Sequence, residues 1–283
     1  MKIRVNLGRN WKRYLSFLAG LFLFVAPFAL VARGAYWVMG SASKPSIHST
    51  CLRMTVEWLF SGRFLGAALG NPLNFAIIVL PSLAFFFGPL WCGWLCPAGS
   101  IPEVLSRIVP RRAKIDLTGR LNPTPIRYGY FAAFALFAFI GLGFTVCCYW
   151  CNFAVMEKIV EGVILLNFSD LAIWAYSTGI ITLVLWLFLL GALIKGGRGW
   201  CSFLCPIGAI QSLAHAAGSH LKRTFKITYY GSKCNDCGQC IEACPMGAAT
   251  LAENSVKINR HACIVCKECV AACNRKALSY SRC

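Results

Sequence analysis

Long apolar stretches without charged residues alternate with short basic segments along the first 220 residues of the chain. A helix that crosses a hydrocarbon core about 30 Å thick needs about 20 predominantly apolar residues. Four stretches have this length, and we expect each to be a transmembrane helix: residues 14–32, 73–91, 128–150 and 171–194. The chain after residue 221 is polar enough for a water-facing domain.

The positions of lysine and arginine predict how these helices are oriented. Cytoplasmic loops carry an excess of both residues. With the N-terminus inside, the inner segments contain thirteen lysines and arginines and the outer segments contain five. We therefore expect residues 1–220 to form a four-span domain in the lipid bilayer of the cytoplasmic (inner) membrane, and residues 221–283 to form a cytoplasmic domain. Both termini are then cytoplasmic. A cleaved signal peptide is the weaker interpretation of residues 14–32, because its apolar region would be unusually long.

The composition agrees with a membrane protein, since 58% of the residues are hydrophobic and only 13% are charged. A formal charge of +18 would suit a nucleic-acid partner if it formed a basic stripe. Much of this charge instead flanks the predicted spans, where it would meet anionic lipid headgroups. We expect no nucleic-acid partner.

Eight of the 17 cysteines lie in the C-terminal segment as two runs of the form C-x-x-C-x-x-C-x-x-x-C. This spacing is typical of bacterial two-cluster ferredoxins, in which the fourth cysteine of each run binds the other cluster. The rule predicts one [4Fe-4S] cluster on Cys234, Cys237, Cys240 and Cys273, and a second on Cys263, Cys266, Cys269 and Cys244. Structural zinc and disulfides are less favoured alternatives. Short strands at 248–251 and 256–258 would complete an α+β, bacterial-ferredoxin-like domain.

Two further cysteine pairs lie in a repeated segment, WCGWLCPAGSI at residues 91–101 and WCSFLCPIGAI at residues 200–210. Each copy contains C-x-x-x-C-P, and the four cysteines are Cys92, Cys96, Cys201 and Cys205. Thiols at positions i and i+4 share one helix face. Proline after the second cysteine favours an extended backbone there and then suits the first turn of a new helix. Four thiolates can bind an iron-sulfur cluster or another soft metal, and a metal-free redox-active dithiol pair is the main alternative.

The combination of spans, two C-x-x-x-C-P motifs and two ferredoxin runs resembles the membrane-bound ferredoxin-type proteins of the NapH and MauN type, and the membrane part of NosR. The resemblance implies an electron-transfer subunit, with quinone as substrate and quinol dehydrogenase activity. It would connect the membrane quinone pool to a periplasmic oxidoreductase or another ferredoxin-type protein. The family's cysteines correspond to the four motif cysteines and the eight C-terminal ones. A more distant resemblance, to the CcoG type, implies the alternative of an iron-sulfur-dependent copper reductase or metal-centre assembly factor.

Other candidate residues lie outside these motifs. Cys147, Cys148 and Cys151 lie at the predicted periplasmic boundary, and Cys51 lies in the first outer loop. A disulfide is the ordinary expectation there, and a copper or redox site is the sharper alternative. His215 and His220 follow the second motif, and we expect both at the surface.

Overall fold

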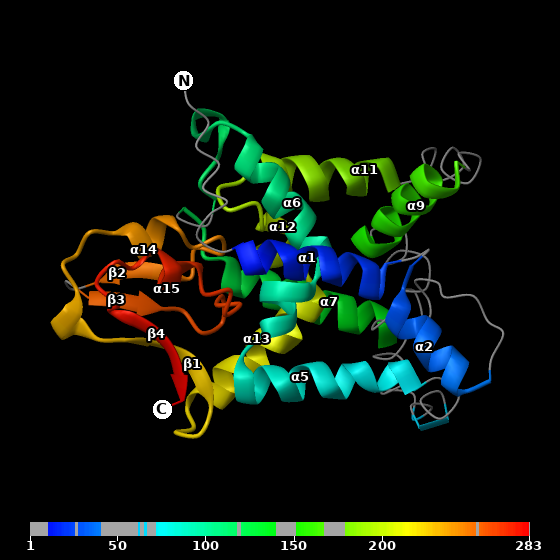
Figure 1. Ribbon diagram of the computed structural model, residues 1–283, viewed down its shortest axis with the longest axis horizontal. Coiled ribbons are helices and arrows are strands. Elements are labelled where there is room, and N and C mark those ends of the chain that lie inside the picture. Colours follow the sequence, from blue (N-terminus) through cyan, green and yellow to red (C-terminus); the bar gives the residue numbers. More distant parts are fainter. Residues whose placement is uncertain are drawn as a thin grey trace.

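The computed structural model describes residues 11–25, 28–40, 62, 65–66, 72–117, 120–139, 151–166, 179–252 and 255–282. A helical part precedes a smaller α+β part, and the two lie at opposite ends of the longest axis (Figure 1). The main helices of the helical part are α1 (Trp11–Phe24), α2 (Leu30–Val38), α5 (Ala76–Phe87), α6 (Pro97–Ile108), α7 (Pro123–Phe139), α9 (Asn152–Leu165), α11 (Gly179–Leu183), α12 (Gly199–Phe203) and α13 (Pro206–Ser219).

The prediction of four transmembrane helices is wrong for the part of the chain that the structure describes. None of its helices is both long enough and apolar enough to cross a membrane. The stretch 14–32 is divided between α1 and α2, and the stretch 73–91 contains only the 12 residues of α5 between a 3-10 turn and a bend. Hydropathy counts apolar residues but does not register such breaks. The later parts of 128–150 and the earlier parts of 171–194 lie outside the described residues.

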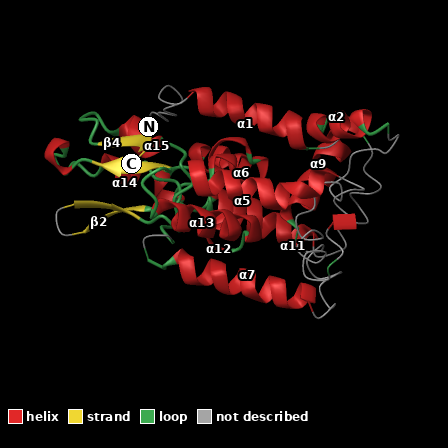
Figure 2. Cartoon of the chain, turned by 90° about the horizontal axis from the view of Figure 1, so that it is seen from below, coloured by secondary structure: helices red, strands yellow, loops and turns green. Residues whose placement is uncertain are grey.

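Two π-helical segments occur in or directly after the apolar stretches. Trp91–Leu95 forms one such segment between α5 and α6, and Val184–Ala192 forms another directly after α11. Trp186 of the second segment donates its indole N–H to the carbonyl of Ala98 at 2.7 Å. α5 packs along α13, while α1 and α7 flank this centre on opposite sides (Figure 2).

The C-terminal part is an α+β module, as the sequence predicted. Strands β1 (Phe225–Tyr229) and β4 (Leu278–Arg282) form one antiparallel pair, and β2 (Ala249–Ala252) and β3 (Ser255–Ile258) form the other. The short strands expected at 248–251 and 256–258 are therefore confirmed to within one residue. Two short helices, α14 (Gln239–Glu242) and α15 (Glu268–Ala272), lie between them in the chain.

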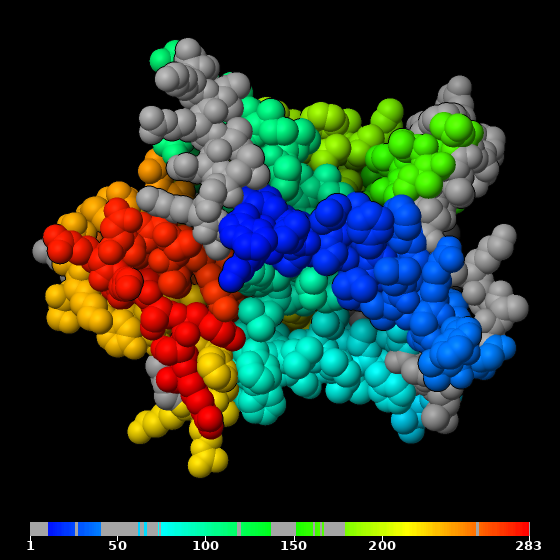
Figure 3. Space-filling model, in the orientation of Figure 1, coloured from blue at the N-terminus to red at the C-terminus, as the bar shows by residue number. Residues whose placement is uncertain are grey.

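The α+β module packs directly against the ends of the helices. Figure 3 shows its orange and red residues in contact with the blue residues of α1 and the cyan residues that follow α5. Tyr280 donates its hydroxyl to the carbonyl of Phe87 at 2.8 Å, and Trp94 donates to the carbonyl of Val265 at 3.1 Å. The predicted domain boundary at residue 220 falls between the end of α13 and the start of β1.

Candidate functional site

The twelve cysteines singled out by the sequence line three separate cavities, four to each cavity. The distal cavity is lined by Cys234, Cys237, Cys240 and Cys273. The proximal cavity is lined by Cys244, Cys263, Cys266 and Cys269. The repeat cavity is lined by Cys92, Cys96, Cys201 and Cys205. The grouping of the first eight follows the exchange of fourth cysteines between the two runs.

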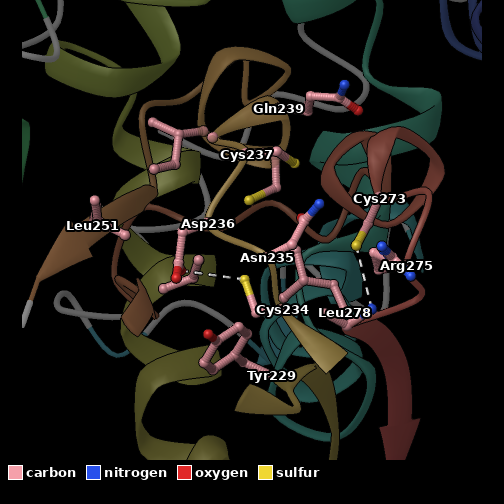
Figure 4. Close-up of a pocket in the computed structure, with 15 residues that line it drawn as sticks. Tyr229, Cys234, Asn235, Asp236, Cys237, Gln239, Leu251, Cys273, Arg275 and Leu278 are labelled. Atoms are coloured by element: carbon pink, nitrogen blue, oxygen red, sulfur yellow. Dashed lines mark hydrogen bonds between the residues drawn. The ribbon is translucent and has the colours of Figure 1, made fainter. Parts of the chain in front are cut away.

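The distal cavity lies at the outer end of the α+β module. Cys234 and Cys237 come from one loop and Cys273 from another, and the three face the same space in Figure 4. Cys237 is exposed, as are its neighbours Asn235 and Asp236. The distal cavity is therefore the thiol-lined cavity that surrounding solvent, or a partner protein, reaches most directly.

The proximal cavity lies deeper, within the hydrophobic core of the module. Cys263, Cys266 and Cys269 are all buried there. Burial raises the pKa of Cys263 to about 12 and that of Cys266 to about 11. Thiols with such pKa values bind protons at neutral pH unless a metal displaces them, because metal ligation stabilises the thiolate.

The repeat cavity contains the same Cys-Pro junction twice. Cys96 and Cys205 have extended backbones, and Pro97 and Pro206 are the first residues of α6 and α13. This confirms the prediction that each C-x-x-x-C-P motif ends in an extended cysteine followed by a new helix. At Gly99 an added Cβ would lie 2.5 Å from the Arg198 guanidinium and 3.1 Å from Cys201 Sγ, so the close approach of the two copies requires glycine.

Backbone N–H groups donate hydrogen bonds to a sulfur in each cavity. Ala277 donates to Cys273 Sγ and Ala248 to Cys244 Sγ, both at 3.2 Å, and Gly208 donates to Cys205 Sγ at 3.3 Å. Such hydrogen bonds stabilise thiolates and are one of the ways in which a protein sets the potential of an iron-sulfur cluster.

The donor set fits clusters better than single metal ions. Within the described ranges, no three His, Cys, Asp or Glu side chains form a group able to hold one metal ion. A zinc site requires all its sulfurs about 2.3 Å from one ion, whereas a [4Fe-4S] cluster takes one cysteine at each of its irons. The spaces that these residues line measure about 420, 340 and 490 Å³, including the part that is open to solvent. The residues present therefore fit three cubane clusters.

A buried ion network connects the proximal and repeat cavities, and the sequence analysis did not identify it. Glu103 pairs with Arg13 at 2.7 Å, with Arg198 at 2.6 Å and with Arg107 at 2.9 Å. Arg13 also pairs with Glu268 of α15 at 2.7 Å. Burial alone would raise the pKa of Glu103, but the three arginines outweigh it and lower the pKa to about 2.

The histidines after the second motif and the predicted outer cysteines have different outcomes. His215 is buried beside Gly88, so the expectation of a surface histidine is wrong for this residue, whereas His220 is exposed as expected. Burial lowers the pKa of His215 to about 4. Cys51, Cys147 and Cys148 lie outside the described residues, and a disulfide among the outer cysteines stays a prediction.

Comparison with known proteins identifies the same two regions. A family model described as a 4Fe-4S binding domain matches residues 73–116 and 178–227, and one described as a 4Fe-4S dicluster domain matches residues 226–274. Ferredoxin-type protein NapH of Escherichia coli is 28% identical over 78% of this chain and 70% of its own length, and NapH of Haemophilus influenzae is 27% identical over 96% and 88%. The chain is a homologue of these ferredoxin-type proteins.

The ferredoxin-type homologues extend beyond NapH. Methylamine utilization ferredoxin-type protein MauN of Methylobacillus flagellatus is 29% identical over 68% of this chain and 59% of its own length. No solved structure matches the chain. The resemblance to NapH- and MauN-type proteins is confirmed, and with it an iron-sulfur electron-transfer class for this chain. The number of clusters, the quinone substrate and the location at the cytoplasmic membrane stay predictions.

The exchange of fourth cysteines gives a specific test. Cys273 is the fourth cysteine of the second run but lines the distal cavity with the first three cysteines of the first run. Replacing Cys273 with serine should therefore impair the cluster of Cys234, Cys237 and Cys240, and leave that of the second run. Electron paramagnetic resonance of the reduced variants should show that Cys273→Ser and Cys244→Ser each lose a different signal. Loss of the same signal in both variants would contradict the grouping.

Proposed function

We propose that this ferredoxin-type protein carries single electrons between a quinol and a redox partner protein, using [4Fe-4S] clusters in all three cavities. An iron-sulfur cluster, when bound, accepts and releases one electron without a proton or a covalent intermediate. The chain's residues supply the ligands, exclude water and hold the cavities close together. The quinol as donor rests on the family resemblance alone.

The observation that carries this proposal is the shared wall between the repeat and proximal cavities. Met246 and Ile264 line both cavities. Cys92 and Cys201 of the repeat cavity pack against the core that contains Cys263, Cys266 and Cys269. An electron that moves between these two cavities has only this wall to cross.

The two ends of the proposed chain of sites differ in exposure. The four cysteines of the repeat cavity are half-buried, whereas Cys237 of the distal cavity is exposed. The distal cavity is therefore the proposed point of exchange with the partner protein. The outer cysteines that would favour copper reduction lie mainly outside the described residues, so we do not propose that alternative.

Reduction by a quinol tests the proposed donor. The anaerobically purified protein is mixed with a short-chain quinol analogue, and the cluster absorbance and the paramagnetic signals are followed. We expect reduction of at least one cluster, and none in a sample mixed with the oxidised quinone. Clusters that respond to dithionite but never to quinol would overturn the quinol as donor, and would leave the iron-sulfur assignment standing.

Gly93 provides a prediction about the contact between the repeat cavity and the proximal cavity. A Cβ at this position would lie 2.3 Å from the carbonyl oxygen of Ile264 and 3.3 Å from the amide nitrogen of Cys266. Because backbone cannot yield as a side chain does, Gly93→Ala should separate the two segments and destabilise the protein by about 1–3 kcal/mol. In rapid-mixing experiments, quinol should reduce the ferredoxin clusters of this variant more slowly than those of the parent protein.

Gly129 is a matched control, because an added Cβ there meets nothing within 4 Å. Gly129→Ala should leave the reduction rate unchanged. Equal rates in Gly93→Ala and the parent protein would argue against electron transfer at this contact.

A further inference from the structure

Two buried arginines face the repeat cavity together with its four thiols, and they bear on what the cavity holds. Arg127 of α7 and Arg198, just before α12, are 2% and 1% exposed. Both line the cavity. Neither belongs to the cysteine motifs, and neither is needed to provide a ligand. The inference drawn from them rests on the proposed cluster in this cavity.

Arg198 is held in place by partners on one side and leaves one nitrogen free. Its Nε donates to Glu103 at 2.6 Å, and its Nη1 donates to the carbonyl of Cys92 at 2.6 Å. Nη2 is buried and has no hydrogen-bond partner among the described residues. The side chain lies beside Cys201, where burial raises the pKa of the thiol and the Arg198 charge lowers it in part.

Arg127 has carbonyl partners but no carboxylate within the described part of the chain. Its Nη1 donates to the carbonyl of Cys201 at 3.4 Å, and its Nη2 donates to the carbonyl of His261. Its Nε is buried without a partner among the described residues. The side chain thus brings a full positive charge into the protein interior and connects α7 to the α+β module.

The arginines leave positive charge around the repeat cavity that the described carboxylates do not neutralise. Two carboxylates, Glu103 and Glu268, serve the three arginines Arg13, Arg107 and Arg198, and Arg127 has no acidic partner among the described residues. A buried charge without a counter-charge is strongly unfavourable. A neutral pair of dithiols would leave this charge uncompensated, whereas a [4Fe-4S]²⁺ core with four thiolates carries a net charge of about −2.

We propose that Arg127 and Arg198 are the counter-cations of an anionic [4Fe-4S] cluster in the repeat cavity and raise its reduction potential. Reduction adds one electron to a group that is already negative. Adjacent positive charges in a medium of low dielectric constant stabilise the more negative, reduced form. Both arginines are positioning residues: they contribute no ligand, and they make the cavity's cluster easier to reduce than it would be without them.

The test is a redox titration followed by electron paramagnetic resonance, with Arg127→Met, Arg198→Met and Arg127→Lys. The signal of the repeat cavity is assigned first, as the one that a Cys92→Ser, Cys201→Ser variant lacks. At a fixed potential, each methionine variant should lower the ratio of reduced to oxidised cluster by at least about tenfold, which corresponds to about 59 mV for a one-electron couple. Arg127→Lys keeps the charge and should stay within about threefold of the parent, which is about 28 mV by the same conversion.

The two ferredoxin signals serve as an internal check that each variant is folded. Arg111→Met is the matched surface control, since Arg111 is exposed and pairs only with Glu242 among the described residues. A repeat-cavity signal that is present but unchanged in both methionine variants would overturn the role of the arginines and leave the proposed function intact. Absence of a third signal in the parent protein would overturn both.

Discussion

Replacing Glu103 with glutamine is expected to lower the free energy of unfolding by about 3–5 kcal/mol, the cost of removing one partner from a buried ion pair. Glu103 is buried and accepts hydrogen bonds from Arg13, Arg198 and Arg107. Glutamine has nearly the same shape but no charge. The variant would therefore leave arginines buried without their shared carboxylate.

Denaturant unfolding of the intact protein, followed by tryptophan fluorescence, measures this effect. The matched control is Glu242→Gln, which removes an exposed pair with Arg111 at 3.0 Å and should cost less than about 1 kcal/mol. Equal losses in the two variants would contradict the structural importance of the buried network.

The same carboxylate predicts how stability depends on pH. Its pKa is lowered from 4.5 to about 2 in the folded protein. Glu103 therefore contributes stability that is fully present above pH 4.5 and is lost as the pH falls towards 2. The parent should lose more stability than Glu103→Gln over this interval. If the free energy of unfolding changed equally with pH in the two proteins, the lowered pKa of Glu103 would be contradicted.

Replacing Cys92 and Cys201 together with serine is expected to remove one entire cluster, or about four iron atoms per chain. The two residues come from different copies of the repeat and both line the repeat cavity. Serine is a poor ligand for iron in a cluster, and two thiols alone cannot hold a cubane. The ferredoxin clusters should remain, because none of their eight cysteines is altered.

Iron analysis and quinol reduction of this variant give two separate results. Iron should fall by about four atoms while the ferredoxin signals persist, and reduction by quinol should be lost. Cys151→Ser is a suitable control, since Cys151 lines none of the three cavities. A double variant that keeps all its iron would contradict a cluster held by Cys92 and Cys201.

The cysteine spacing predicted the groups of thiols because short spacings fix local geometry. A C-x-x-C-x-x-C run brings three thiols into one loop, and a proline after Cys96 or Cys205 determines both the extended backbone and the start of the next helix. These constraints act within a few residues. They were therefore visible in the sequence and are found in the structure.

The buried arginines were not predictable in this way. Arg13 meets Glu103 and Glu268 across 90 and 255 residues of chain. Arg198 and Glu103 flank the repeated segments, and the equivalent places beside the other copy hold Pro89 and Ser212. The shared cysteines and glycines therefore stand out when the two copies are aligned, whereas the charged residues beside them do not.

The transmembrane prediction failed for a related reason. Mean hydropathy describes which residues avoid water, but it does not show where a helix is interrupted. The short α5, with Pro81 inside it, and the π-helical segment after α11 are apolar elements of limited length. Leu185, Leu187 and Leu190 of the π-helical segment pack with Trp186 and Trp200 in one core.

The most direct test of three cluster-bearing cavities is the content of iron and acid-labile sulfide in the anaerobically purified, full-length chain. Three [4Fe-4S] clusters require about twelve atoms of each per chain. About eight of each would show that only the ferredoxin runs hold clusters and would contradict the assignment of the repeat cavity.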